Sequence, residues 1–198
     1  MKKNLIGITG SISSGKSKVS EYLKEKGYLV IDTDKITHDL YEYRNKGYIE
    51  IAAHFPNAIS GNCVDRKKLG EIVFNNPDKL KLLNSIIHPL VKEELLNQVK
   101  LCDDEIIFVE VPLLFEANFD KECNKILCVY VNNDIQIERL MKRNNIDKSE
   151  AIKLINKQMD INTKAKLSDY VIDNSYDISN TYQEIDKFLL KLKEDLYA

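Results

Sequence analysis

The sequence predicts an α/β fold of three layers, in which a five-stranded parallel sheet lies between helices. Two observations lead to this class. Short apolar runs, which are typical of buried strands, alternate along the chain with segments whose apolar residues have helical spacing. The pattern G-x-x-x-x-G-K-S occupies residues 10–17, between the first apolar run and the first helical segment, which is the context in which this pattern binds phosphate.

Composition indicates one globular domain. The 198 residues suffice for a single compact core with a small insertion, and 43% hydrophobic and 30% charged residues are typical of a folded chain. A net charge of −2 argues against a general nucleic-acid binder, which usually carries a basic surplus. No apolar stretch approaches the ~20 residues of a membrane span, and none has the length of a secretion signal's core, so we expect a cytoplasmic protein without membrane contact.

The N-terminal segment predicts a strand, a helix and a second strand. Residues 5–9 form a short apolar run, and a helix begins at about Lys16. Gly27 ends this helix, because glycine tolerates the left-handed backbone that commonly follows a helix. Residues 28–31 form the second strand, so the phosphate loop lies at a strand-to-helix turn, as its motif requires.

The next strand, residues 106–109, follows an interval far longer than a crossover helix requires. The interval must therefore hold a substructure of its own, and its apolar spacing indicates helices. Asp65 can cap one helix, and Asn76-Pro77 can begin another. We expect His88-Pro89 to break the second helix, with a third at about residues 91–99.

The C-terminal part continues the alternation of strands and helices. The final helix is expected to begin at about Thr181, where Thr181 and Glu184 match a capping box. The elements expected before it are strand 126–131, charged helices at about 134–144 and 148–159, and strand 170–172.

The phosphate loop predicts binding of a nucleotide's phosphates together with Mg²⁺. Lys16 would reach the β- and γ-phosphates, and Ser17 would offer its hydroxyl to the metal. Gly10 and Gly15 would let the backbone approach the phosphates closely. The residues expected to surround the nucleotide are Gly10, Ser11, Ile12, Ser13, Ser14, Gly15, Lys16, Ser17 and Lys18.

Two acidic residues end the second strand, at the edge of the sheet where ligands bind in open α/β folds. Strand alternation predicts that Asp32 and Asp34 point to one side and Thr33 to the other. One carboxylate could orient an attacking hydroxyl while the other holds a Mg²⁺-bound water. Equally, the pair could simply cap the next turn, and the position alone leaves both interpretations open.

Other charged or titratable residues allow two interpretations each. Arg139 and Arg143 are one helical turn apart and could close over a triphosphate, or could belong to a solvated charged face. Glu110 could reach a Mg²⁺-bound water, whereas His88 is more typical of a capping or packing histidine. The four cysteines include no C-x-x-C pair, which favours reduced, buried thiols over a zinc site.

A nucleotide switch is disfavoured by missing motifs. A GTP switch needs an Asp-x-x-Gly turn that senses the γ-phosphate, and no aspartate here has glycine three residues later. It also needs an Asn-Lys-x-Asp motif that recognises guanine, and in the Asn-Lys sequence at Asn156 the aspartate comes one residue too late. Phosphoryl transfer to a small hydroxyl-bearing acceptor, held by the helical interval, fits best. Three hypotheses therefore stay open: a kinase for one such acceptor, a nucleoside or nucleoside monophosphate kinase, and a regulatory module that binds ATP without transferring its phosphoryl group.

The specific stretches, taken together, resemble the dephospho-coenzyme A kinase family over essentially the whole chain. The resemblance implies ATP-dependent phosphorylation of the 3′-hydroxyl of dephospho-CoA, the last step of CoA synthesis, by a monomer or small homo-oligomer. It also implies a P-loop kinase-like core at about residues 1–40, 101–133 and 165–198, a CoA-binding insertion at 41–100 and a lid at 134–164. The stretches are IGITGSISSGKS, VIDTDKITHDL, VDRKKLGEIVFNNP, IIHPLVKEEL, VEVPLLFEANF, IERLMKRNNI and SDYVIDNS.

The resemblance also implies roles for particular residues. Asp34 becomes the candidate base for the acceptor hydroxyl, with Asp32 beside it, and Arg143 becomes the leading lid arginine. The residues implied to line the acceptor site are His88, Pro112, Leu113, Leu114 and Phe115.

The chain departs from the family pattern at two places. The family usually has GGIGSGKST at the loop, whereas this chain has Ser11 and Ser13 for two glycines and Lys18 for threonine. Where the family commonly has a Lys-Arg pair, this chain has Lys164-Ala165-Lys166, and no role is assigned there.

Overall fold

A computed structural model describes residues 3–197. Contacts between Cα atoms divide the chain into two compact units. The first comprises Met1–Ile31 and Asp103–Ala198, and the second comprises Asp32–Cys102. The first unit contains the phosphate loop and nearly all of the main sheet, and each unit is described by itself.

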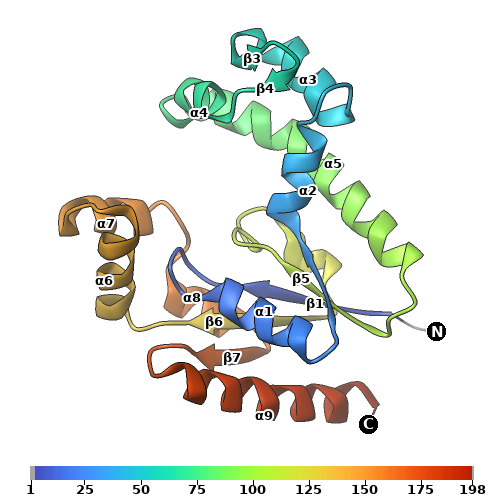
Figure 1. Cartoon of the computed structure of the whole chain (residues 1–198), viewed down its shortest axis with the longest axis vertical. Helices are drawn as coiled ribbons and strands as arrows, with labels where there is room; N and C mark the ends of the chain where they lie inside the picture. Colours follow the sequence, from blue (N-terminus) through green and yellow to red (C-terminus); the bar gives the residue numbers. More distant parts are fainter. Residues whose placement is uncertain (1–2, 198) are drawn as a thin grey trace. The chain divides into compact units, whose positions relative to one another are not determined.

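The main sheet has five strands, as predicted, in the order β2-β5-β1-β6-β7 (Figure 1). The pairings of β1 with β5, β1 with β6 and β6 with β7 are all parallel, so the carboxyl ends of these strands lie at one edge. That edge carries the phosphate loop directly after β1. The strands are β1 (Asn4–Thr9), β2 (Leu29–Asp32), β5 (Ile106–Glu110), β6 (Lys125–Tyr130) and β7 (Tyr170–Asp173).

Two helices cover one face of the sheet. Ile6 and Ile8 of β1 pack in a core with Val19 and Leu23 of α1 (Lys16–Glu25) and with the apolar side of α9 (Ile178–Tyr197). Figure 1 shows α9 running alongside β7. The stacked rings of Tyr22 and Tyr182 join the two helices, with centroids 4.1 Å apart.

The other face is covered by the segment after β5. Gly7 alternates with Ile6 and Ile8, and a Cβ atom built on it would lie 2.6 Å from Leu114 Cδ1. A side chain at position 7 would therefore collide with the side chains of Leu114 and Cys123, which pack against this face of β1. Helix α8 (Ile161–Leu167) contacts β6, and a turn of 3₁₀ helix, Phe119–Glu122, leads into that strand.

A helical pair follows β6, namely α6 (Asn133–Asn144) and α7 (Lys148–Ile155), which lie side by side (Figure 1). Ile137, Leu140 and Ala151 form the small core between them. The predicted second helix of this pair extends to about residue 159, whereas α7 ends at Ile155. Helix α8 was not predicted: Asp160 caps it through the amides of Asn162 and Thr163, at a point where the apolar pattern of the sequence continues.

The second unit is mainly helical, as the sequence predicts for this interval. Asp65 caps α4 through the amides of Lys67 and Lys68, and Asn76 caps α5 through the amide of Lys79, both as predicted. A short antiparallel hairpin in this unit was not predicted. The elements are α2 (Thr33–Leu40), α3 (Lys46–His54), a 3₁₀ turn (Pro56–Ala58), β3 (Ile59–Ser60), β4 (Cys63–Val64), α4 (Arg66–Phe74) and α5 (Pro77–Leu101).

The predicted helix break at His88-Pro89 is wrong. Helix α5 runs through Pro89 without interruption for 25 residues. Proline removes one backbone hydrogen bond from a helix interior, a cost of about 3 kcal/mol. Ile87, Val91 and Leu95 are buried on both sides of it, and contacts with α2, α3 and α4 keep the helix in one piece.

The predicted capping box at Thr181 is also wrong. Helix α9 begins at Ile178, so Thr181 lies inside its first turn, buried, and its hydroxyl donates to Asn174 Oδ1 at 2.8 Å. Glu184 instead accepts a hydrogen bond from the amide of Asp173 at the end of β7. Both side chains therefore fasten α9 to the carboxyl edge of the sheet.

The four cysteines are free thiols. Cys128 is buried, and burial raises its pKa to about 12, so it stays protonated at neutral pH. Cys63 is exposed, which departs from the expectation that all four thiols are buried. None of the described helices combines the length and apolar character that crossing a bilayer requires.

Candidate functional site

The phosphate loop connects β1 to α1 with three residues in the left-handed region, Gly10 (φ 153°), Ser13 (φ 59°) and Gly15 (φ 94°). Helix α1 starts at Lys16 without a side-chain cap. Its first backbone amides therefore point into the loop, where they can bind an anion together with the positive end of the helix dipole. Lys16 Nζ donates to the carbonyl oxygens of Gly10 and Ser11, each at 3.1 Å, which holds the ammonium over the loop.

The end of β7 supports the loop from the side. The buried Asn174 donates through Nδ2 to the carbonyl oxygen of Ser14 at 2.8 Å, and its Oδ1 accepts from Thr181. A Cβ atom at Gly15 would lie 2.0 Å from Asn174 Nδ2. Glycine is thus needed at position 15 for space as well as for its positive φ.

The helical pair and the connection that follows α7 both contact the loop at Ile12. The amide of Ile12 donates to Gln158 Oε1, and the carbonyl oxygen of Ile12 accepts from Gln136 Nε2, both at 2.8 Å. The Ile12 side chain packs against the core formed by Ile137, Leu140 and Ala151. The phosphate loop and the predicted lid therefore share a packed and hydrogen-bonded contact.

Three buried polar atoms near the loop have no hydrogen-bond partner among residues 3–197: Ser13 Oγ, Ser14 Oγ and Gln136 Oε1. Buried polar atoms are nearly always paired, so a cluster of exceptions at one loop points to a polar ligand that completes it. This observation fits a phosphate-bearing nucleotide at the loop.

Ser13 is strained, because it occupies a left-handed conformation that costs a non-glycine residue about 1–2 kcal/mol. Replacing Ser13 by glycine should therefore stabilise the protein by about 1 kcal/mol, after the added entropy of the unfolded chain is counted. Urea unfolding monitored by circular dichroism measures this change. Ser11→Gly is the matched control, since Ser11 is not among the positive-φ residues, and it should not stabilise. A stabilising Ser11→Gly, or a destabilising Ser13→Gly, would contradict the strain argument.

The prediction that Asp32 and Asp34 lie on one side of a strand is wrong. Strand β2 ends at Asp32, and Asp34 lies in the first turn of α2. Asp32 caps that helix, because its Oδ1 accepts from the amides of Asp34 at 2.8 Å and Lys35 at 3.4 Å. The capping interpretation thus describes Asp32, whereas the Asp34 side chain is exposed. Both residues belong to the second unit.

Oxygen ligands gather beside the first turn of α1. Glu110 ends β5, and its Oε2 accepts from the hydroxyl of Ser20 at 2.6 Å. Ser17 precedes Ser20 by three residues, so both hydroxyls lie on neighbouring parts of the same helix surface. Hydroxyl and carboxylate oxygens are the ligands that Mg²⁺ prefers, and the side chains present therefore suit that ion.

The segment Pro112–Phe115 follows β5 as a series of turns. Leu113 is exposed and Phe115 half-buried, whereas Leu114 is fully buried beside Gly7 and supports the segment from the core. Lys164 Nζ donates to the carbonyl oxygen of Pro112 at 2.8 Å. The segment is thus held at the same sheet edge as the phosphate loop.

The remaining candidates differ in their exposure. Arg143, in the last turn of α6, is exposed, and its Nε donates to Asn144 Oδ1 at 3.0 Å. Arg139 on the preceding turn is half-buried. His88 lies in α5 of the second unit, and its partial burial lowers its pKa, which favours the neutral imidazole at pH 7.

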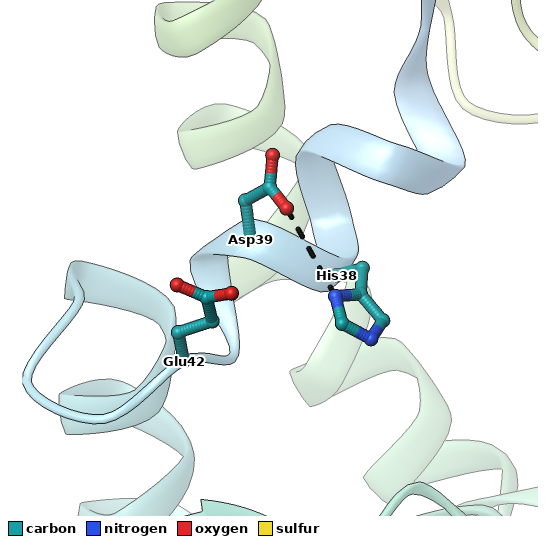
Figure 2. A group of neighbouring side chains, drawn as sticks. All are labelled: His38, Asp39 and Glu42. Carbon is teal, nitrogen blue, oxygen red and sulfur yellow. Dashed lines mark ion pairs between the residues drawn. The ribbon is translucent and has the colours of Figure 1, made fainter.

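A group of potential metal ligands that the sequence analysis did not identify lies in the second unit. His38, Asp39 and Glu42 each offer one ligand atom within 4.8 Å of the others (Figure 2). His38 Nδ1 and Asp39 Oδ1 are 3.9 Å apart, and all three residues are exposed. Exposed ion pairs at such distances contribute little, so we regard this group as a solvated surface cluster.

Several residues of the site were missed because they act across long sequence separations. Gln136, Gln158 and Asn174 contact the phosphate loop from more than a hundred residues away. The burial of Lys164 could have been predicted from the sequence, since Lys164 lies three residues after Ile161 and so falls on the apolar side of α8. A lysine in that position calls for a buried partner.

Comparisons with a family model, with related sequences and with solved structures all find dephospho-CoA kinases. The family model described as dephospho-CoA kinase matches residues 4–180. The dephospho-CoA kinase of Oceanobacillus iheyensis is 43% identical and covers 94% of this chain and 96% of its own. A solved dephospho-CoA kinase from Campylobacter jejuni is 30% identical with a TM-score of 0.73, covering 98% of each chain. A solved Thermus thermophilus protein, also 30% identical, has a TM-score of 0.85 and covers 97% of this chain and 99% of its own.

Proposed function

The chain belongs to the dephospho-CoA kinase family, and on that premise we propose how its own residues divide the work of phosphoryl transfer. The reaction is the ATP-dependent phosphorylation of the 3′-hydroxyl of dephospho-CoA, which gives CoA in the last step of its synthesis. The observation that carries this conclusion is the family match over residues 4–180, which spans both units rather than the phosphate loop alone.

The donor side is the phosphate loop. Backbone amides at the uncapped start of α1 bind the phosphate oxygens of ATP, and the hydroxyls of Ser13 and Ser14 gain partners there. Lys16 exchanges the carbonyl oxygens of Gly10 and Ser11 for β- and γ-phosphate oxygens. Its ammonium then stabilises the charge that develops as the bond between the γ-phosphorus and the β-phosphate oxygen breaks.

Ser17 is the residue we assign to Mg²⁺, with Glu110 able to accept a hydrogen bond from a metal-bound water. Mg²⁺, when bound, neutralises charge on the β- and γ-phosphate oxygens. Glu110 accepts from Ser20, which lies one helical turn after Ser17, and the oxygen chemistry of Ser17 and Glu110 supports the assignment.

The acceptor side depends on Asp34. Its carboxylate accepts a hydrogen bond from the 3′-hydroxyl, orients the oxygen towards the γ-phosphorus and takes the proton late, as the new O–P bond forms. The capping role of Asp32 supports Asp34 as the base, because the amides of α2 already engage Asp32. His88, neutral at pH 7, lines the acceptor site together with Pro112, Leu113 and Phe115.

The lid contributes Arg143. Its exposed guanidinium lies in the last turn of α6, where a long side chain can move to the transferring phosphoryl group. The hydrogen bonds of Ile12 with Gln136 of α6 and with Gln158, just after α7, support this role, because they tie the predicted lid to the loop that holds the donor. A cytoplasmic location and a monomeric or small oligomeric state stay predictions.

The test is ADP release with ATP and Mg²⁺, comparing dephospho-CoA with a panel of nucleosides and nucleoside monophosphates. We expect stimulation by dephospho-CoA alone, with a product that matches CoA by mass. Stimulation by a nucleoside or nucleotide instead would keep the donor site and overturn the acceptor. ATP binding without stimulation by any acceptor would indicate a regulatory module.

A further inference from the structure

Lys164 of α8 has a fully buried side chain, although it carries an ammonium group. Its Nζ donates to the carbonyl oxygen of Pro112 at 2.8 Å and lies 3.0 Å from Glu116 Oε1. A buried ammonium is tolerated only where such partners replace water. Both partners belong to the five residues that follow Val111, so the ammonium acts on one short segment.

Glu116 extends this contact towards the donor side. Its Oε1 also accepts a hydrogen bond from the amide of Met159 at 2.9 Å. The neighbouring Gln158 accepts from the amide of Ile12 in the phosphate loop at 2.8 Å. Two consecutive residues of the connection between α7 and α8 therefore bind the segment after β5 on one side and the phosphate loop on the other.

We propose that Lys164 is a positioning residue for the acceptor: together with Glu116 it fixes the Pro112–Glu116 segment and joins it, through Met159 and Gln158, to the loop that binds ATP. This inference rests on the proposed function, in which Pro112, Leu113 and Phe115 line the acceptor site. Lys164 itself touches neither substrate.

The physical need for such a residue follows from the local structure. The segment is made of turns, and the backbone hydrogen bonds printed for it run mainly to its own continuation, as from the amide of Ala117 to the carbonyl oxygen of Leu113 at 2.8 Å, so its place at the sheet edge depends on side-chain contacts. In the proposed function this segment lines the acceptor site, so its displacement weakens acceptor binding, and a misplacement of about 1 Å can cost up to about a hundredfold in kcat/KM. An apolar side chain at position 164 would fill the space without donating to the carbonyl oxygen of Pro112, which would keep the longer bond from Thr9 Oγ1 at 3.5 Å.

The experiment compares Lys164→Met with Lys166→Met, an exposed lysine on the same helix. For Lys164→Met we expect the KM for dephospho-CoA to rise about tenfold, while equilibrium binding of a fluorescent ATP analogue without acceptor stays within about twofold of wild type. Lys166→Met should change neither. An unchanged acceptor KM in Lys164→Met, or an equal loss of ATP binding, would overturn the proposal, since the second result describes a general structural defect.

A second variant covers the case in which Lys164→Met does not fold. Glu116→Gln keeps an oxygen for the amide of Met159 but removes the charge that pairs with Lys164. We expect a several-fold rise in the acceptor KM with normal ATP binding, and an unchanged KM would refute the role. These outcomes can be distinguished from failure of the proposed function itself, because in that case dephospho-CoA would not stimulate ADP release even by the wild-type protein.

Discussion

Lys16→Ala is expected to lower kcat by about a thousandfold, because removing one preorganised charge from a transferring phosphoryl group costs about 4 kcal/mol of transition-state stabilisation. In the structure the ammonium lies over the phosphate loop, where the carbonyl oxygens of Gly10 and Ser11 hold it. Initial rates of ADP release at saturating ATP and dephospho-CoA measure it.

Lys24→Ala is the control for this variant. Lys24 is an exposed lysine of the same helix, in the last turn of α1 and away from the loop. Its replacement should leave kcat within about twofold, as expected for a surface substitution far from the site. If Lys16→Ala retained normal turnover, the loop would bind nucleotide without taking part in catalysis.

Much of the fold could be predicted because its signals are local. The loop pattern, the left-handed Gly27 after α1, and the caps at Asp65 and Asn76 each depend on a few neighbouring residues. The strands are short apolar runs that match a sheet covered on both faces. These features obey rules of backbone geometry and hydrogen bonding that operate within one turn of chain.

The errors arose where tertiary contacts outweighed a local rule. Pro89 should end a helix, yet burial of Ile87 and Val91 keeps α5 continuous. Thr181 matches a capping box, yet it bonds to Asn174 across the turn between β7 and α9. A residue pattern cannot report which of two competing partners lies nearby in space.

The candidate site shows the same difference between local signals and tertiary contacts. The phosphate loop could be located from a contiguous motif, whereas the residues that hold the loop in place could not. Gln158 reaches Ile12 over 146 residues of sequence, and Lys164 reaches Pro112 over 52. Ser13 is an intermediate case: the departure from glycine was visible in the sequence, but its left-handed backbone was not.

The second large effect is expected for Asp34→Asn, with kcat reduced about a hundredfold and ATP binding unchanged. Asparagine keeps one oxygen that can orient the acceptor hydroxyl, but it cannot take the proton, and general-base contributions are about 10²–10⁴-fold. The lower end of that range applies, because a ribose hydroxyl is a weak acid that loses its proton late. Asp34→Ala removes orientation as well and should lose about a further tenfold.

Asp39→Asn is the matched control, since Asp39 is an exposed aspartate on the same helix. Asp34 lies in the first turn of α2, so its neutralisation also removes a favourable interaction with the helix dipole of about 0.5 kcal/mol. Thermal unfolding should therefore show a small loss of stability for Asp34→Asn, far too small to explain the kinetic defect. Near-normal turnover of Asp34→Asn would exclude Asp34 as the base. In that case Asp32, whose Oδ1 caps α2 while the same carboxylate carries a second oxygen, becomes the residue to replace next.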